Sequence, residues 1–162
     1  MSAAPGFVAD AMLGRLTRWL RLAGYDVLYD ARMDDNELVR LARQSGRVLL
    51  TRDRQLAQRP RVTTVLVASE KAQEQLRQVL CQYPSAERPP PRCALCNGEL
   101  IVAGRHEVEG EVPAYVWVNQ DAFRRCRSCG RIHWEGTHWR RISAVLRGAM
   151  GPGDCDGVDT GT

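Results

Sequence analysis

Hydrophobic positions follow two alternating patterns along the first half of the chain. Phe7 to Ala9 is a short unbroken apolar run, and apolar residues then recur at helical spacing from Leu13 to Ala23. An unbroken short run is typical of a buried strand, whereas a spacing of three and four places side chains on one face of a helix. This segment therefore predicts a strand followed by a helix, which Gly24 ends.

The same alternation continues until a proline-rich segment begins. Strands are predicted at 25–29, 48–51 and 62–68, and helices from Asp34 or Asp35 to Gly46, through Leu56, and from Ser69 to about Leu80. Strands that alternate with helices form a parallel sheet with helices on both faces. We therefore expect an α/β domain over residues 1–83.

The composition changes after this domain. Residues 84–92 are rich in proline and cannot continue a helix or a central strand, so we expect a semi-rigid linker there. Short apolar segments at 100–103 and 114–118 then predict a small β module over residues 93–147. Glycine, aspartate and threonine dominate residues 148–162, which we expect to be disordered. The first module has an apolar pattern of its own, so a fragment ending near Arg88 is predicted to fold alone.

The chain has no apolar run near the roughly 20 residues that a membrane span requires. Its first residues lack the basic stretch and the apolar core of a secretion signal. We therefore expect a cytoplasmic protein that does not bind a membrane. The sequence has 44% hydrophobic residues and a net charge of +4, which suit a folded protein and permit a polyanionic partner.

Most of the six cysteines form two Cys-x-x-Cys pairs. The paired residues are Cys93, Cys96, Cys126 and Cys129. In a reducing compartment such pairs are more often metal ligands than disulfides, and structural zinc prefers a tetrahedron of thiolates. We therefore predict a zinc ribbon; the alternatives are a redox dithiol, unligated cysteines, and a site for iron or an iron cluster. Cys81 and Cys155 are interpreted as incidental unpaired thiols.

Acidic residues stand where the predicted strands end. Asp10 follows the first strand, Asp53 follows the third, and Asp34 or Asp35 begins the helix after the second. The carboxyl ends of parallel strands form the ligand crevice of an open sheet, so these side chains should converge there. Like charges repel unless a cation neutralises them, and magnesium or manganese is the hard cation that carboxylates bind. Each residue also has an alternative role as a helix cap or a turn residue.

The residues around these acids resemble the Mut-seven-C RNase family, a PIN-like nuclease family. The similarity lies in the segments Phe7 to Leu16 (FVADAMLGRL), Trp19 to Arg21 (WLR), Gly24 to Asp26 (GYD) and Leu50 to Asp53 (LTRD). The cysteine pairs and the segment Trp134 to Trp139 (WEGTHW) are similar to that family's C-terminal zinc ribbon. The resemblance covers about residues 7–142.

This resemblance implies a PIN-like fold and metal-dependent hydrolysis of RNA phosphodiester bonds. The residues at the catalytic positions are Asp10, Asp35, Asp53 and Thr51. Asp10 and Asp53 would hold a magnesium or manganese ion, which would stabilise the transition state and activate water. PIN domains commonly carry a further acid after the next strand, where this chain has Ser69 and Glu70.

Arginines are the candidate contacts to RNA phosphates. Arg15, Arg18 and Arg21 recur with one spacing after Asp10, which places them near the predicted crevice, and a solvated helix face is the alternative. Further candidates lie beside Asp53 and at the second cysteine pair; these are Arg52, Arg124 and Arg125.

Three functional hypotheses follow from these observations. The first is a metal-dependent endoribonuclease with structural zinc, catalytic Mg²⁺ or Mn²⁺, and a zinc ribbon that adds contacts to RNA. The second is a non-catalytic RNA-binding or ribonucleoprotein-associated protein, such as a ribosome-associated one, that keeps the PIN-like fold. The third is a protein-interaction adaptor that docks through the ribbon. RNA is the expected partner in the first two, and a ribonucleoprotein particle is a further partner in the second.

Overall fold

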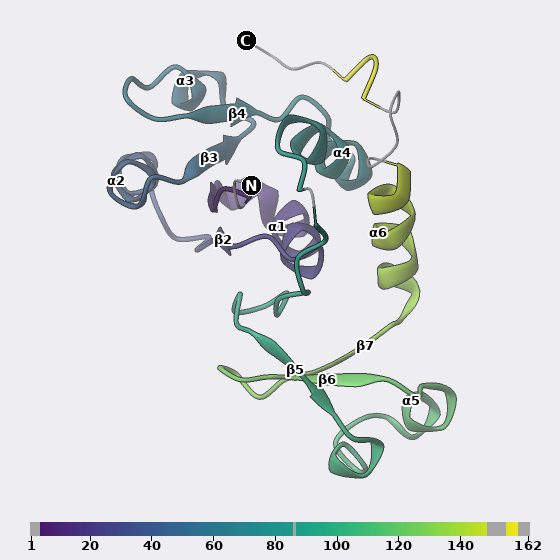
Figure 1. Cartoon of the computed structure of the whole chain (residues 1–162). Helices are drawn as coiled ribbons and strands as arrows, with labels where there is room; N and C mark the ends of the chain where they lie inside the picture. The colour runs from purple at the N-terminus through teal and green to yellow at the C-terminus, as the bar shows by residue number, and fades with distance from the viewer. Residues whose placement is uncertain (1–3, 86, 149–154, 159–162) are drawn as a thin grey trace.

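The structure is a computed structural model that describes residues 4–85, 87–148 and 155–158 (Figure 1). Within these residues the chain forms a four-stranded parallel sheet and a three-stranded antiparallel sheet. The strands of the parallel sheet are β1 (Phe7–Ala9), β2 (Val27–Leu28), β3 (Val48–Thr51) and β4 (Thr64–Leu66). Their spatial order is β2-β1-β3-β4, so β1 and β3 are the two central strands.

Helices cover both faces of this sheet. They are α1 (Gly14–Leu22) with the short turn η1 (Ala11–Leu13) before it, α2 (Asp35–Ser45), α3 (Arg54–Ala57) and α4 (Ala72–Gln82). Successive residues of β1 point to opposite faces, so Phe7 joins a core with α1 and α4 while Val8 joins a core with α2 and α3. The predicted α/β fold with a parallel sheet is confirmed.

The second sheet belongs to the small module that carries the cysteine pairs. Its strands are β5 (Leu100–Ala103), β6 (Phe123–Cys126) and β7 (Ile132–Trp134), paired in the order β5-β6-β7. The turn η2 (Arg105–Glu107) and the helix α5 (Ala114–Asn119) lie between β5 and β6. This antiparallel sheet, with its cysteines, fits a zinc ribbon.

The prediction of a β segment over 114–118 is wrong, because these residues form α5. Val112 and Val116 are four positions apart and pack together with Phe123 in the core of the ribbon. Tyr115 and Val118, which lie between and after them, are 71% and 65% exposed. The apolar run therefore has one buried stripe rather than two, and this arrangement suits a helix.

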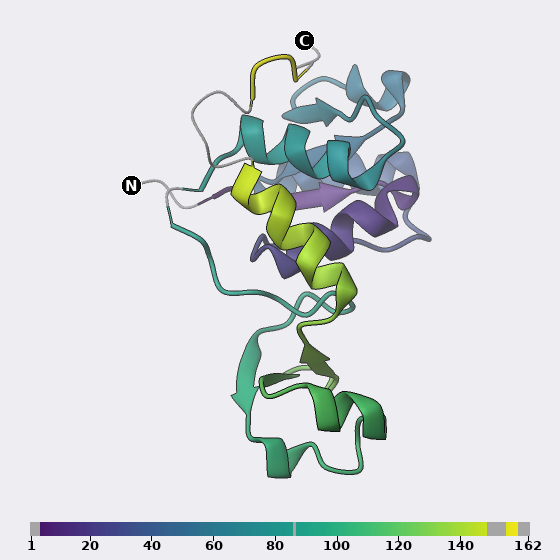
Figure 2. The same ribbon diagram turned by 90° about the vertical axis from the view of Figure 1, so that its right-hand side faces the viewer.

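The last helix, α6 (Thr137–Gly148), returns from the ribbon to the first module. It lies beside α4 and α1 in both views (Figures 1 and 2). Ile142 and Leu146 are buried in the same core as the apolar side chains of α1 and α4. The sequence alone predicts these residues in the second module, over 93–147. The ribbon is thus an insertion between two helices, α4 and α6, that both pack on the first module.

A polar junction joins the first cysteine knuckle to the start of β2. The amide Nδ2 of Asn97 donates a hydrogen bond to the carboxylate of Asp26 at 2.7 Å, and its Oδ1 accepts one from the backbone N–H of Val27 at 3.1 Å. Gly24 has a φ of +96°, and a Cβ there would lie 2.5 Å from the carbonyl oxygen of Pro89. The linker therefore packs directly on the turn that follows α1.

The segment after α6 gives one further correction. Most of the residues predicted to be disordered, 149–154 and 159–162, lie outside the described residues. Gly148, however, is the last residue of α6, and Cys155 is joined by a disulfide to Cys81 near the end of α4. The interpretation of these two cysteines as unpaired thiols is therefore wrong. The sequence does not show that the chain end returns to α4, because the pairing spans 74 residues.

Candidate active site and metal centre

The candidate active site lies where β1 and β3 end side by side. In the sheet, β1 has β2 as its neighbour on one side and β3 as its neighbour on the other. The chain goes from β1 to β2 and then crosses back to β3, so the strand order reverses at β1. Open α/β sheets bind ligands beyond the carboxyl ends of their strands at such a point. Asp10 directly follows β1, and Thr51 is the last residue of β3.

A single hydroxyl group connects two of the three predicted catalytic acids. The Oγ1 of Thr51 donates a hydrogen bond to Oδ2 of Asp10 at 2.8 Å and accepts one from the backbone N–H of Asp53 at 3.0 Å. Thr51 is fully buried, and Asp10 is only 8% exposed. The bond to Asp10 is buried and the bond from Asp53 is partly buried, so Thr51 fixes the orientation of the Asp10 carboxylate and the position of the Asp53 backbone.

Asp53 also caps a helix. Its Oδ1 accepts hydrogen bonds from the backbone N–H groups of Gln55, at 2.7 Å, and Leu56, at 3.1 Å, at the start of α3. The predicted alternative role as a cap is therefore real. In the part of the chain that the structure describes, Oδ2 of Asp53 has no hydrogen-bond partner, so this oxygen remains available to a ligand.

The structure distinguishes Asp34 from Asp35. Asp34 is the N-cap of α2 and forms a capping box with Glu37, in which each side chain accepts from the other residue's backbone N–H at 2.9 Å. Asp35 is exposed in the first turn of α2. Asp34 thus caps its own helix through one carboxylate oxygen, whereas the carboxylate of Asp35 makes no hydrogen bond among the described residues.

These carboxylates do not form a compact cluster. We consider groups of at least three His, Cys, Asp or Glu residues whose ligand atoms all lie within 4.8 Å of one another. Among the described residues, only the four cysteines form such a group. The three predicted acids are therefore not gathered around one point, although Asp10 and Asp53 are connected through Thr51.

Glu70 is a further acid at this edge, after β4. Its carboxylate lies 3.4 Å from the guanidinium of Arg52, which directly follows Thr51. The Nε of Arg52 is buried and has no hydrogen-bond partner in the described residues. The predicted RNA contact Arg52 is therefore already engaged with an acid, although one of its donors remains unused.

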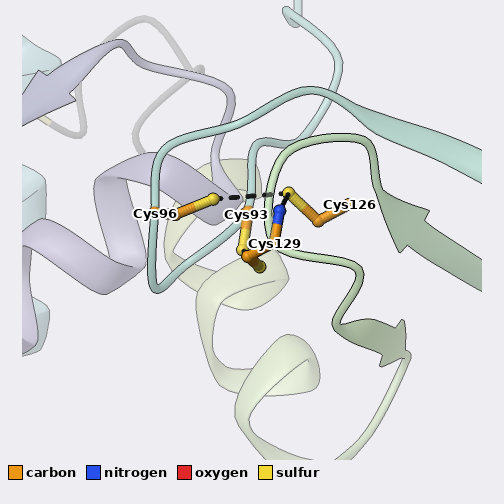
Figure 3. A group of neighbouring side chains, drawn as sticks. All are labelled: Cys93, Cys96, Cys126 and Cys129. Carbon is orange, nitrogen blue, oxygen red and sulfur yellow. Dashed lines mark hydrogen bonds between the residues drawn. The ribbon is translucent and has the colours of Figure 1, made fainter.

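The four cysteines form the candidate metal centre (Figure 3). The Sγ atoms of Cys93 and Cys129 are 3.7 Å apart, and those of Cys96 and Cys126 are 3.3 Å apart. Four thiolates at about 2.3 Å from a zinc ion would be about 3.8 Å from one another, so the thiols are already close to tetrahedral spacing. The arrangement has no position left for water and fits a structural zinc ion.

The surroundings of the thiols support this assignment. A Cβ at Gly98 would lie 2.8 Å from Sγ of Cys126, so the first knuckle requires a glycine there. Burial raises the pKa of Cys93 to about 12. Burial acts in the same direction on Cys126, but the backbone N–H groups of Cys129 and Ser128 and the thiol of Cys96 outweigh it and lower the pKa of Cys126 to about 7. The Nε2 of His133 lies 3.3 Å from Sγ of Cys93 and belongs to the shell around the ligands.

The arginines of α1 have different surroundings. Arg15 and Arg18 are exposed, as a role in binding phosphate requires. Arg21 is 5% exposed, and its guanidinium donates to the carbonyl oxygen of Val27 at 2.8 and 3.0 Å and to those of Ala94 and Leu95 at 3.1 Å. Burial lowers the pKa of Arg21. The prediction that Arg21 binds RNA is wrong, because its donors hold the first knuckle against β2.

The arginines of the ribbon differ in the same way. Arg124 is exposed on β6. Arg125 makes two hydrogen bonds to the carboxylate of Glu111, at 2.9 and 3.0 Å, and donates to the carbonyl oxygens of Glu107 and Gly130. A guanidinium with this many internal acceptors stabilises the ribbon, so Arg125 does not fit the predicted RNA contact. Arg124 remains a candidate.

The fold and the site define a class of α/β protein that has acidic residues at the switch point of a parallel sheet. A four-cysteine module is inserted in the same chain between α4 and α6. The chain belongs to the Mut7-C RNAse domain family, whose model matches residues 5–146. The expected family is therefore confirmed, and membership indicates a ribonuclease-like function with RNA as the substrate class. Comparisons with curated proteins and with solved structures found no match. No helix in the described ranges has the length and apolar character needed to cross a membrane.

Proposed function

We propose that this protein is a metal-dependent ribonuclease that hydrolyses RNA phosphodiester bonds beyond the ends of β1 and β3. The observation that carries the proposal is the hydrogen-bonded connection of Asp10, Thr51 and Asp53 at the switch point of the sheet. Family membership supports the reaction class, and the acids supply the chemistry that this reaction needs. The four cysteines would bind one structural zinc ion.

The acids fit a divalent cation. Asp10 is buried, and no Lys, Arg or His forms an ion pair with Asp10, Asp35 or Asp53 within the residues that the structure describes. A buried carboxylate without a positive partner is costly, so a cation at this position would stabilise it. Mg²⁺ or Mn²⁺ would be held by Asp10 and Asp53, with Asp35 nearby, and would supply positive charge at the phosphate and make water more acidic.

The residues of the chain have separate roles in this proposal. Thr51 holds Oδ2 of Asp10, which leaves Oδ1 of Asp10 for the ligand. Asp53 likewise keeps one oxygen on α3 and offers the other. Arg15 and Arg18 are exposed on the helix that follows Asp10, where they can bind phosphate oxygens of the substrate and position it.

One observation favours a second function, a non-catalytic RNA-binding protein. Asp10, Asp35 and Asp53 do not come together within 4.8 Å as a group, whereas the four cysteines do. A protein that keeps the fold and its arginines without a compact acidic centre would bind RNA and leave it intact. The two functions differ in their dependence on Asp10, so mutation of this residue separates them.

The first prediction is that Asp10→Asn and Asp53→Asn each reduce RNA cleavage to near background. Each change removes a formal charge from the cation site and leaves the side-chain shape almost unchanged, so RNA binding through the arginines should persist. Cleavage of end-labelled RNAs should be measured with Mg²⁺, with Mn²⁺ and without added divalent ion. Asp121→Asn is the matched control, because Asp121 is an exposed acid of the ribbon whose only ion pair in the described residues is with Arg105.

Full activity of Asp10→Asn, or equal activity with and without divalent ions, would reject the metal mechanism. RNA binding without cleavage under every metal would identify the non-catalytic function instead. Cleavage that is lost equally in Asp121→Asn would show that the substitutions act on folding rather than on the site.

A further inference from the structure

A basic groove runs along the boundary between the two modules. It has a volume of about 820 Å³ and takes its walls from α1, the start of α4, the first cysteine knuckle and α6. Its charged lining residues are Arg15, Arg18, Lys71, Arg141 and Glu70. Four of these five are cationic, and the one acid, Glu70, also pairs with Arg52. The groove therefore attracts a polyanion.

A second cavity of about 320 Å³ lies between the end of α1, the linker, the ribbon sheet and the start of α6. Trp134, Trp139 and His133 are among its lining residues, together with the charged side chains of Arg124 and Glu135. Trp134 is 37% exposed although tryptophan is usually well covered. The cavity combines flat aromatic surfaces with a charged donor and a charged acceptor, which suits a planar ring with polar edges.

The two cavities adjoin at one side chain of α1. Leu22 lines both of them, and α6 contributes Trp139 to the aromatic cavity and Arg141 to the groove. Arg15, Arg18 and Leu22 lie on successive turns of one side of α1, which begins just after Asp10 and η1. At about 1.5 Å per residue, the groove extends roughly 10 Å along the helix from the acidic edge to the aromatic cavity.

We propose that the groove and the aromatic cavity form one binding track for single-stranded RNA. This inference rests on the proposed function in taking RNA as the ligand. The groove would bind the sugar-phosphate backbone, and the cavity would take one unpaired base against its aromatic side chains. A base that is paired in a duplex cannot enter such a cavity, whereas an unpaired base stacks on aromatic rings regardless of sequence.

The second prediction is that Trp134→Ala weakens binding of single-stranded RNA by roughly 5- to 100-fold, because it removes a stacking surface. Trp134→Phe keeps an aromatic ring and should restore most of the affinity. Binding of a labelled 12-nucleotide RNA should be followed by fluorescence anisotropy on the full chain, without added Mg²⁺ or Mn²⁺. Tyr115→Ala is the control, because Tyr115 is an exposed aromatic residue on α5 outside both cavities.

The groove is tested by salt dependence. Arg141→Ala should flatten the slope of log affinity against log salt by about 0.7, the change expected for one lost phosphate contact to a single strand. Arg40→Ala should leave the slope unchanged, because Arg40 is an exposed arginine of α2, which packs on the other face of the sheet. The same strand annealed to its complement should bind more weakly than the single strand.

Equal binding of duplex and single-stranded RNA would overturn the proposed track. Wild-type RNA affinity in each of the variants Trp134→Ala and Arg124→Ala that folds would also overturn it. Arg124 is exposed, so its loss tests the cavity even if the tryptophan variant fails to fold. If the substitutions leave RNA affinity unchanged while the protein still cleaves RNA with Mg²⁺, the binding track is rejected and the proposed ribonuclease function is retained. If the substitutions weaken RNA binding but the protein cleaves no RNA with any metal, the binding track is retained and the proposed ribonuclease function is rejected.

Discussion

Arg18 and Arg21 show how far the surroundings decide the role of a residue type. Both are arginines of α1, three positions apart, and their spacing in the sequence gives them the same predicted role. Arg18 faces the groove, whereas Arg21 lies in the last turn, where the linker crosses the helix and Arg92 donates its backbone N–H to the carbonyl oxygen of Arg21. One residue is placed to contact a ligand, and the other joins the two modules.

The third prediction separates these roles. Arg21→Ala should lower the free energy of unfolding by about 2–4 kcal/mol, because the buried carbonyl oxygen of Val27 and two partly buried carbonyl oxygens lose their charged donor and a cavity remains. Arg18→Ala should change the free energy of unfolding by less than about 0.5 kcal/mol but weaken RNA binding. Chemical denaturation and RNA titration of both variants measure the two effects. A stable Arg21→Ala protein with reduced RNA affinity would contradict the role given to Arg21.

At the candidate site, the sequence predicts acids but not their partners. Asp10, Thr51 and Asp53 could be placed at one edge because strand ends are visible in the hydrophobic pattern. The internal contacts of Arg21 and Arg125 could not be predicted, because their acceptors, such as Leu95 and Glu111, are distant in the sequence. The charge of a side chain is known from its identity, but its burial depends on which remote segment packs over it.

Among the elements, α6 differs most from the sequence-based expectation. The parallel strands and their helices are visible in the sequence because each is bounded by glycine, proline or a capping residue. The apolar residues of α6 have helical spacing too, but spacing does not tell which module they face. The structure places Ile142 and Leu146 against α1 and α4, so the first core is completed by residues that follow the ribbon.

The fourth prediction is that Ile142→Ala destabilises the first module by about 2–5 kcal/mol, because Ile142 is fully buried and the change leaves a cavity. Arg140→Ala is the control, since Arg140 is exposed on the same helix. Thermal and chemical unfolding measure the difference. The sequence alone predicts that a fragment ending near Arg88 folds by itself. Because Ile142 and Leu146 complete the core of this fragment, we instead expect it to expose the same core surface and to show molten or aggregated behaviour. If that fragment unfolds cooperatively and is as stable as the full chain, α6 does not complete the core of the first module.

On the scale of the whole molecule, the candidate zinc site is coupled to the contact between the modules. The carbonyl oxygens of Ala94 and Leu95, which lie between the first two cysteines, are also the acceptors of Arg21. Asn97, directly after Cys96, contacts Asp26 and Val27. A metal ion that fixes this knuckle would therefore also fix the surface that docks on the first module.

The fifth prediction is that the protein contains one zinc ion per chain, which Cys126→Ser removes together with the docked arrangement of the ribbon. Elemental analysis should give the zinc content, and hydrogen exchange of the first knuckle and of β2 should report the docking. Cys81→Ser is the control, because Cys81 pairs with Cys155 and lies outside the four-cysteine group. Zinc content unaffected by Cys126→Ser, or zinc lost in Cys81→Ser, would contradict the assignment.

The insertion of the ribbon between α4 and α6 has a consequence for the rate at which RNA is captured. Two chain connections and the contacts of Arg21 hold the ribbon, so both walls of the groove are in place before a ligand arrives. When a ligand binds across both modules, the ligand loses conformational entropy, but the protein does not have to lose any to form the groove. Association should therefore follow a single exponential whose rate is set by electrostatic attraction and falls with salt, with no slow closing step.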